Sequence, residues 1–405
     1  MIQIRASIPW LLCLAGLVFP FSVAAENAIL GACIGLGLIS GIFWQGVQLI
    51  WNAYRTLAIA LAAYFSLMVL GLIWSIDPGW GLYVVGHQWF WLILPIVVVA
   101  LSDGKWKKRF LIFFSAGLMT HLIFCLLQKS GFVILEFAGS NAADATGYIG
   151  HIGFGLVYGI WAGWLMHWGW GESGRMRWLA WFLSLFAWMM IFSAQGRGGY
   201  VIALAVFLAV CMRHFIGMGW KTYLIPLGSV GLMCVLLAFG PGQSRIVDAW
   251  HGLEAIRSGD LSHADARWPM WIGAVEVWKS SPAFGVGTGG FQKALAEVWK
   301  ERPELIYAGS GGVAPNHPHN MYVLSLARLG LVGLGAFVLL LIVLCRNGWK
   351  QDWSPPEGSL FFLTGIALSV DAIFGPSLEQ HFTGIMLALM LGLALSSDKG
   401  RTIQT

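Results

Sequence analysis

The chain is dominated by apolar runs of about twenty residues, close to the length of an α-helix that crosses a bilayer core of roughly 30 Å. Alternation with a period of two, which is typical of outer-membrane barrel strands, is absent. The pattern therefore predicts an all-α polytopic membrane protein with about twelve transmembrane helices. The predicted spans are 8–25, 28–50, 57–74, 80–101, 110–128, 148–168, 178–195, 199–213, 222–240, 319–345, 359–377 and 382–397.

The composition supports this prediction. Of the 405 residues, 58% are hydrophobic and only 11% are charged, which excludes a water-soluble globular fold. The six cysteines are scattered through the apolar runs without a Cys-x-x-Cys pair, so we expect neither a disulfide framework nor a zinc site. The net charge of +5 is spread over short loops, which indicates membrane topology rather than nucleic-acid binding.

Positive side chains alternate between the two sides of the predicted bundle. One set of connecting segments holds fourteen lysines and arginines, whereas the short loops on the opposite side hold only Lys129 and Arg197. By the positive-inside rule, we expect both termini to be cytoplasmic. The first span ends in Val23-Ala24-Ala25, which also resembles a signal-peptidase site, and cleavage there would leave the remaining topology unchanged.

One predicted connection is much longer than the others. Residues 241–318 form an outer segment of 78 residues, which separates helices 1–9 (1–240) from helices 10–12 and a short tail (319–405). Loops of this length usually carry function. Two stretches with helical spacing predict amphipathic helices on the membrane face: Ile246, Trp250, Leu253 and Ile256, then Trp268, Trp271, Val275 and Trp278. Proline and glycines in 280–290 (SSPAFGVGTGG) should end the second helix.

Two arginines on the predicted outer side are candidate anion-binding residues. Arg197 lies in the turn Gln195-Gly196-Arg197-Gly198-Gly199, against the general rule for short outer loops, and the glycines would let a bulky substrate approach the backbone. The alternative interpretation is that Arg197 binds a lipid phosphate or caps a helix C-terminus. Arg267 opens the second amphipathic stretch, where a salt bridge to Asp265 or Glu276 is the alternative interpretation.

His319 is the third candidate, immediately before the tenth span. At about 100° per residue, Gly330 and Gly333 fall within roughly 20° and 40° of the His319 face of a continuous helix, so the three should share one stripe. Small residues in such a stripe would let a neighbouring helix pack closely. Arg328 falls nearly opposite the His319 face, so we expect it to lie in a different environment. A lone interfacial histidine is otherwise usually only amphipathic.

The pattern His-Asn-x9-Gly-x-x-Gly, at His319-Asn320 and Gly330 to Gly333, resembles the signature of the O-antigen ligase family. The Arg-Gly-Gly turn at Arg197 and the run from Arg267-Trp268 to Phe291 resemble the family's other landmarks, so the resemblance covers about residues 10–397. Arg328 departs from the acidic or neutral residue expected there. The ligase, O-antigen polymerase and protein O-oligosaccharyltransferase branches share much of this pattern, and the chain looks most like the ligase.

The resemblance implies a glycosyltransferase of GT-C-like architecture in the bacterial inner membrane, with its active site facing the periplasm. It implies undecaprenyl diphosphate-linked O-antigen as donor and a sugar hydroxyl of lipid A-core as acceptor. Membrane lipids are the other expected partners. A transporter of the same lipid is the alternative from another class, but the matching half-chains and broken helices that would favour it are not visible in the sequence.

The residues support the same chemistry without a metal. Transfer from a diphosphate requires stabilisation of negative charge on the leaving group. The first predicted outer loop holds only Glu26-Asn27 and the second centres on Asp77, so paired carboxylates for a metal are not found there. Guanidinium groups grip phosphate oxygens bidentately, which assigns Arg197 and Arg267 to the diphosphate.

An imidazole that titrates near neutrality suits a general base for the acceptor hydroxyl, which assigns His319. Direct attack would then invert the anomeric configuration without a covalent intermediate. The glycine run 285–290 lacks the Gly-Lys-Ser/Thr ending of a nucleotide-binding loop, so no cofactor is expected. Supporting roles are assigned to Asn320, to His151 near the donor, and to Asp371, which with Glu379 is a candidate to orient His319.

Overall fold

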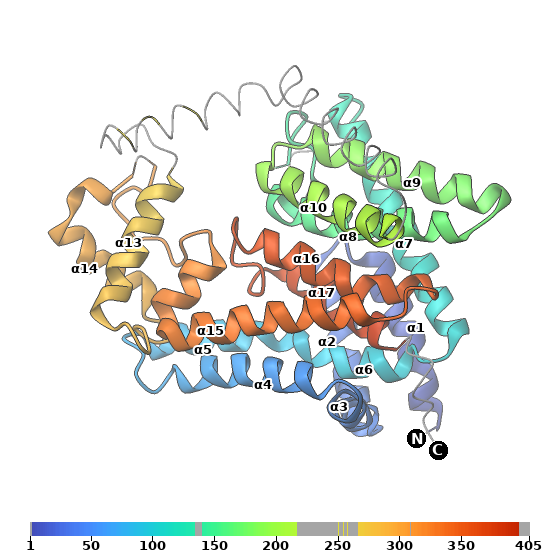
Figure 1. Ribbon diagram of the computed structural model, residues 1–405, viewed down its shortest axis with the longest axis horizontal. Coiled ribbons are helices and arrows are strands. Elements are labelled where there is room, and N and C mark those ends of the chain that lie inside the picture. Colours follow the sequence, from blue (N-terminus) through green and yellow to red (C-terminus); the bar gives the residue numbers. More distant parts are fainter. Residues whose placement is uncertain are drawn as a thin grey trace.

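The computed structural model describes residues 2–133, 140–216, 266–307 and 309–396, together with Trp250, Glu254 and Arg257. Helices are the only regular elements in this part of the chain, as the apolar pattern predicts (Figure 1). Each predicted span contains helix, although not over its full length, except 222–240, which lies outside the described residues, as do most residues of the first predicted amphipathic stretch.

The first half contains helices α1 (Ile2–Val18), α2 (Val23–Ile39), α3 (Ile42–Ala53), α4 (Arg55–Leu70), α5 (Pro78–His87), the 3-10 turn η1 (Gln88–Leu92), α6 (Ile93–Ala100), α7 (Gly104–Lys129), η2 (Gly147–Ile149), α8 (Gly150–Gly171), α9 (Gly174–Ser193) and α10 (Arg197–Phe215). The second half contains α13 (Arg267–Ser280), α14 (Phe291–Glu301), η5 (Pro303–Leu305), α15 (Met321–Lys350), η6 (Pro356–Gly358), α16 (Ser359–Asp371) and α17 (His381–Leu395).

Five helical stretches in the described residues are long and apolar enough to cross a membrane, or six with one bent pair. The chain is therefore a multi-pass membrane protein, and the further spans predicted from the sequence remain predictions. The five are Pro78–Ala100, Gly104–Lys129, Gly174–Ser193, Arg197–Phe215 and Met321–Lys350.

The predicted span 28–50 is not one straight helix. Its two parts, α2 and α3, meet at an angle of 83°. Gly41 adopts a left-handed backbone (φ 77°), and the carbonyl of Ser40 that the break exposes accepts a hydrogen bond of 2.7 Å from Arg5 Nη2. A charged donor therefore satisfies a backbone group that the interrupted helix leaves without an intrahelical partner.

Glu26 was predicted in an outer loop, but it lies inside the first turn of α2 and is fully buried. Its Oε2 lies 3.2 Å from His381 Nε2 at the start of α17. The helix begins at Val23 because the Ser22 hydroxyl caps the N–H of Ala25, so Glu26 is carried into the bundle.

Packing in the bundle brings the predicted outer helix ends together. Helix α8 packs against α9, α10 and α16, and α15 packs against α4 and α16. A Cβ on Gly155 of α8 would collide with Gly199 of α10, so this pair of glycines allows the two backbones to approach closely. The close approach places the start of α10, which carries Arg197, beside the start of α8, which carries His151.

A helix, α13, lies where the second amphipathic helix was predicted, and it ends at Ser280, where the glycine-rich run begins; its buried residues are Pro269, Met270, Gly273, Ala274 and Val277 rather than the predicted stripe. Figure 1 shows α13 and α14 together at one end of the long helix α15. The segment between them packs onto α15: Val286 and Gly287 donate to the carbonyls of Ala327 and Arg328, and Leu331 donates to the carbonyl of Pro282.

These contacts correct the predicted stripe of His319, Gly330 and Gly333. Helix α15 begins only at Met321, and Gly330 is non-helical (φ 65°, ψ −160°), so no continuous helix relates the three residues. A Cβ on Gly330 would collide with the carbonyl of Ala283. The glycine therefore admits the 281–290 segment against a break in α15, rather than a neighbouring helix.

Candidate active site

The turn between α9 and α10 places Arg197 at the first position of a helix. Gly196 is the N-cap and offers no side chain, so the first N–H groups of α10 are not capped by it. Exposed N–H groups and the helix dipole make such an N-terminus favourable for anions. The turn is held from α10 by the Tyr200 hydroxyl, which donates to the carbonyl of Ala194.

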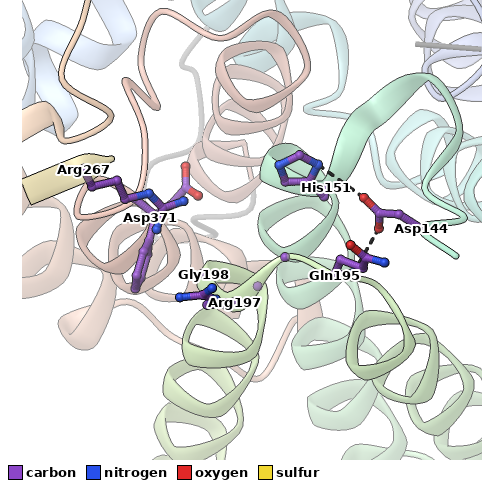
Figure 2. Close-up of a pocket in the computed structure, with 10 residues that line it drawn as sticks. Asp144, His151, Gln195, Arg197, Gly198, Arg267 and Asp371 are labelled. Carbon is purple, nitrogen blue, oxygen red and sulfur yellow. Dashed lines mark hydrogen bonds and ion pairs between the residues drawn. The ribbon is translucent and has the colours of Figure 1, made fainter. Parts of the chain in front are cut away.

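A cavity of about 250 Å³ opens above this turn (Figure 2). It collects residues from the 140–149 loop, α8, the α9–α10 turn, α13 and the end of α16. Its lining residues are Asp144, His151, Gln195, Gly196, Arg197, Gly198, Gly199, Arg267, Asp371 and Phe374. Four residues that the sequence singled out, Arg197, Arg267, His151 and Asp371, therefore share one cavity.

Arg267 enters the cavity from the first position of α13. Its guanidinium carbon lies 5.9 Å from the centre of the Phe374 ring, within the range of a cation–π contact. Phe374 also lies against Gly198, where an added Cβ would collide with its ring. One aromatic side chain thus touches both the arginine of α13 and the turn that carries Arg197.

Glu276, an alternative partner predicted for Arg267, pairs with two other cations. Its Oε1 lies 3.0 Å from Lys279 Nζ and 2.8 Å from Arg302 Nη1. Glu276 lies nine residues after Arg267 on α13 and does not line the cavity, whereas Arg267 does. Asp265, the other alternative, lies outside the described residues.

Asp371 and His151 stand on different sides of the cavity. Asp371 is the last residue of α16 and is 1% exposed, and its Oδ2 has no hydrogen-bond partner among the described residues. Figure 2 shows it beside Arg267, with His151 and Asp144 across the cavity and Arg197 between the two groups in this view.

Asp144 joins two walls of the cavity, a contact that the sequence analysis missed. Its Oδ2 lies 3.3 Å from His151 Nδ1, and its Oδ1 accepts a hydrogen bond of 2.9 Å from the N–H of Gln195. Partial burial alone would raise the pKa of Asp144, but the hydrogen bonds from His151 and Gln195 and nearby positive charge outweigh it and lower the pKa. The carboxylate therefore stays ionised at neutral pH.

His319 does not line the cavity, but contacts on either side tie it to the cavity's elements. The Trp271 indole of α13 donates to the carbonyl of Pro318 over 2.9 Å, and the N–H of Met321 donates to the carbonyl of Ala372 over 2.7 Å. His319 is thus held next to α13, which carries Arg267, and the end of α16, which carries Asp371. Its backbone is left-handed (φ 52°), an unusual conformation for a residue with a side chain.

The neighbouring His317 supports this conformation. Its Nδ1 accepts a hydrogen bond of 3.3 Å from the N–H of His319, and the two ring centres are 4.3 Å apart. Burial, followed by repulsion from His319 and Arg328, lowers the pKa of His317 to about 3. His317 is therefore a neutral acceptor at physiological pH.

Asn320 has a local structural role at the same place. It is the N-cap of α15, where its Oδ1 accepts a hydrogen bond of 3.1 Å from the N–H of Val323. This cap fixes where the helix begins, and therefore fixes the turn that holds His319 outside the helix.

Glu379 pairs with Arg328, and this pair corrects two expectations about them. Arg328 Nη1 lies 2.5 Å from Glu379 Oε1, and its Nη2 donates to the carbonyl of Asn316 over 3.2 Å. Glu379, predicted as one candidate to orient His319, is instead the partner of Arg328. Arg328 was predicted to lie in an environment apart from His319, but it bonds the loop that carries His319.

Within the described residues, no group of three histidine, cysteine, aspartate or glutamate side chains is arranged to hold a metal ion. The two carboxylates that line the cavity, Asp144 and Asp371, come from different walls. The cavity lining contains the guanidinium groups of Arg197 and Arg267, the imidazole of His151 and the N-terminus of α10, all of which favour an anion.

Asp144 could have been found from its sequence position. It lies seven residues before His151, in the third predicted outer connection. The outer carboxylates that the sequence singles out, Glu26 and Asp77, lie in the first two. Phe374, in contrast, has no distinguishing sequence signal, because it is one of 25 phenylalanines in an apolar chain.

Comparisons with known proteins place one part of the chain in a family. A search of curated proteins found no match for the chain. Residues 180–338 match the model of the family described as O-antigen ligase, and this segment includes Arg197, Arg267 and His319 but neither His151 nor Asp371. Residues 180–338 are therefore similar to the O-antigen ligase family over this domain.

Proposed function

We propose that this protein is an O-antigen ligase that transfers O-antigen polysaccharide from undecaprenyl diphosphate to a sugar hydroxyl of lipid A-core. The reaction takes place at the periplasmic face of the bacterial inner membrane and completes lipopolysaccharide. The observation that carries the proposal is that Arg197 and Arg267, which come from separate parts of the chain, line one cavity. The family match supports the same class of enzyme.

The donor diphosphate binds between the two arginines. Each guanidinium presents a planar pair of N–H donors to phosphate oxygens, and the charge does not depend on pH. The N–H groups at the start of α10 add donors from a third direction. Charge that develops on the leaving diphosphate is therefore stabilised by groups that the fold holds in place before the reaction.

His319 acts as the base that accepts the proton of the attacking hydroxyl. It is held where α13 and the end of α16 meet, beside the cavity that binds the donor. The hydroxyl oxygen attacks the anomeric carbon as the bond to the diphosphate breaks, and the configuration inverts in a single displacement. Asp371 and His151 support the bound substrates, and Asn320 holds the helix start beneath His319.

The proposal requires no metal ion or cofactor, which a chelation experiment tests. Purified enzyme treated with EDTA should keep its transfer activity. Activity that disappears with EDTA and returns with Mg²⁺ would contradict an account based on arginines alone.

Reconstitution tests the reaction itself. Purified protein in proteoliposomes, given an undecaprenyl diphosphate-linked oligosaccharide and lipid A-core, should form glycosylated core with inverted anomeric configuration. Mass spectrometry and linkage analysis of the product measure both. Absence of product with this donor and acceptor, in protein shown to be folded, would reject the ligase proposal.

A deletion strain separates the ligase from its relatives. Loss of all O-antigen from core, with accumulation of the lipid-linked polymer, is the expected result. Core that carries a single repeat would indicate a polymerase, and normal lipopolysaccharide with an unglycosylated protein would indicate the protein O-oligosaccharyltransferase branch. Lipid-linked glycan retained on the cytoplasmic side would indicate a transporter.

A further inference from the structure

The wall of the cavity opposite Arg267 is formed by an imidazole and a carboxylate that the family match does not cover. His151 is at the second position of α8, and its side chain is 54% exposed, whereas the side chain of Asp144 is only 11% exposed. The aspartate is thus held in the protein and the imidazole faces the cavity (Figure 2). A substrate in the cavity reaches His151 before it reaches Asp144.

Asp144 fixes the orientation of this imidazole. Its Oδ2 binds His151 Nδ1 at 3.3 Å, so Nε2 is the ring nitrogen left to face a substrate. Its Oδ1 is held by the N–H of Gln195, two residues before Arg197. The Asn141 side chain in turn accepts the N–H of Asp144 over 3.0 Å. The carboxylate is therefore positioned by two backbone contacts and ties the imidazole to the turn that presents Arg197.

Such a pair has a defined chemical use. A carboxylate that accepts Nδ1–H sets the tautomer of a histidine and stabilises the imidazolium when Nε2 carries a proton. An imidazolium of this kind donates Nε2–H to an anion. Its neighbours in the cavity are Arg197 and the N-terminus of α10, which also favour anions.

The charge on the donor changes during the reaction. A diphosphate esterified at both ends carries two negative charges, one on each phosphate, and two arginines balance them. When the sugar–oxygen bond breaks, its electron pair stays on the phosphate oxygen and creates a third negative charge. A further donor at the cavity wall would lower the energy of this state more than that of the bound donor.

We propose that His151 is a third group that contacts the donor diphosphate and donates a hydrogen bond to the oxygen released from the sugar, with Asp144 as its positioning residue. This inference rests on the proposed function. The acceptor hydroxyl oxygen forms the new bond to the anomeric carbon, and its proton goes to His319. His151 stabilises the leaving oxygen and needs no net proton transfer.

The experiment measures kcat and KM for the donor in proteoliposomes, using a synthetic undecaprenyl diphosphate-linked oligosaccharide and purified lipid A-core. His151→Gln should lower kcat about 100-fold, as for loss of one preorganised donor, with little change in KM. Asp144→Asn should also lower kcat, since an amide cannot stabilise the imidazolium. In the His151→Gln background, Asp144→Asn should have little further effect, because its influence passes through His151.

A matched control separates positioning from folding. Asp103→Asn removes an exposed carboxylate that also caps backbone, at 2.9 Å from the N–H of Lys105, at the start of α7. It should leave kcat and KM unchanged. Size-exclusion profiles and Tm identify any variant that fails to fold. If Asp144→Asn does not fold, His151→Gln still tests the proposal, because the His151 side chain is exposed and its replacement should not disturb folding.

The outcomes distinguish this inference from the proposed function. Wild-type protein that makes no product rejects the function. Wild-type protein that transfers, with a His151→Gln variant whose kcat stays within about twofold, overturns the role of His151 alone. A rise in KM at unchanged kcat also overturns it, because the contact would then be made equally to the bound donor. Independent, additive losses from Asp144→Asn and His151→Gln would overturn the positioning role of Asp144.

Discussion

Arg197 and Arg267 differ from Arg328 in what surrounds the guanidinium. Arg197 and Arg267 line an open cavity at the first positions of α10 and α13. Arg328 is 4% exposed; it pairs with Glu379 and donates a hydrogen bond to the carbonyl of Asn316. The comparison teaches that an arginine which stands out in the sequence is placed to bind a substrate only where the fold leaves a cavity beside it.

The two environments also differ in the free-energy cost of leaving a charge unpaired. Arg328 and Glu379 compensate each other in a place with little water, so each is required by the other. Arg197 and Arg267 instead line an open cavity, where water or a ligand can reach the charge. We therefore expect the Arg328–Glu379 pair to contribute to the stability of the fold, and the proposed role of Arg197 and Arg267 is in binding and catalysis.

The sharpest test of the comparison is the removal of a cavity arginine. Arg197→Ala and Arg267→Ala should each lower kcat/KM by about 1000-fold or more, because a charge-assisted contact to the leaving diphosphate is lost. Arg267→Lys should remain impaired, since a point charge cannot reproduce the bidentate fork. Donor-dependent transfer in proteoliposomes measures the effect.

The control for this prediction is Arg175→Ala, which removes an exposed arginine near the start of α9. It should keep wild-type activity. Near-normal transfer by both Arg197→Ala and Arg267→Ala would show that the cavity arginines are no more important for activity than Arg175 or Arg328.

Removal of Arg328 should act on stability instead. Arg328→Met leaves Glu379 without its partner and should lower the free energy of unfolding by about 3 kcal/mol, visible as a lower Tm in detergent. Arg328→Met combined with Glu379→Met should recover much of this loss, because no unpaired charge remains. Activity per folded molecule should fall far less than for Arg267→Ala, and an equal fall would contradict the comparison.

His319→Ala should lower activity less than the loss of a cavity arginine, and the loss should appear as a lower kcat. A general base contributes about 100-fold or more to the rate, and the donor contacts are unaffected, so KM for the donor should change little. The protein should insert and fold normally. Near-normal kcat in this variant would reject His319 as the base.

The smallest expected effect concerns His317, which holds the N–H of His319. Its pKa is lowered to about 3 from the usual 6.5, so the unfolded chain binds a proton that the folded chain rejects between these values. Stability should therefore fall as pH decreases through about 6.5 towards 3. Wild-type Tm should drop more between pH 7 and pH 5 than the Tm of His317→Gln, and an equal drop in both would contradict this assignment.

Much of the fold follows from local pattern. Spans such as 110–128 and 319–345 are recognisable because every residue of a helix in lipid must be apolar or face a partner, and their positions agree with α7 and α15. The amphipathic spacing of Trp268 and Trp271 likewise marks α13. Spacing alone placed Gly330 on a continuous helix, and this was wrong, because the break depends on backbone contacts from Pro282 and Ala283.

The candidate site divides in the same way. Arg197, Arg267 and His319 stand out in the sequence because charged and imidazole side chains are rare in an apolar chain and need a reason. Asp144 does not stand out, because its role depends on distances to His151 and Gln195. The same limit applies to Glu379, which was assigned to His319 but lies against Arg328.

By itself, the sequence determined that the chain is a helical membrane protein, which family it resembles, and which side chains are candidates for the chemistry. Hydropathy and residue type are properties of short segments, so they can be assigned from the sequence alone. Only the tertiary structure decided that Arg197 and Arg267 share a cavity, that Arg328 is already paired, and that His319 lies in a turn ahead of α15. Such pairings are set by how distant segments pack, and packing is a property of the whole bundle rather than of any one segment.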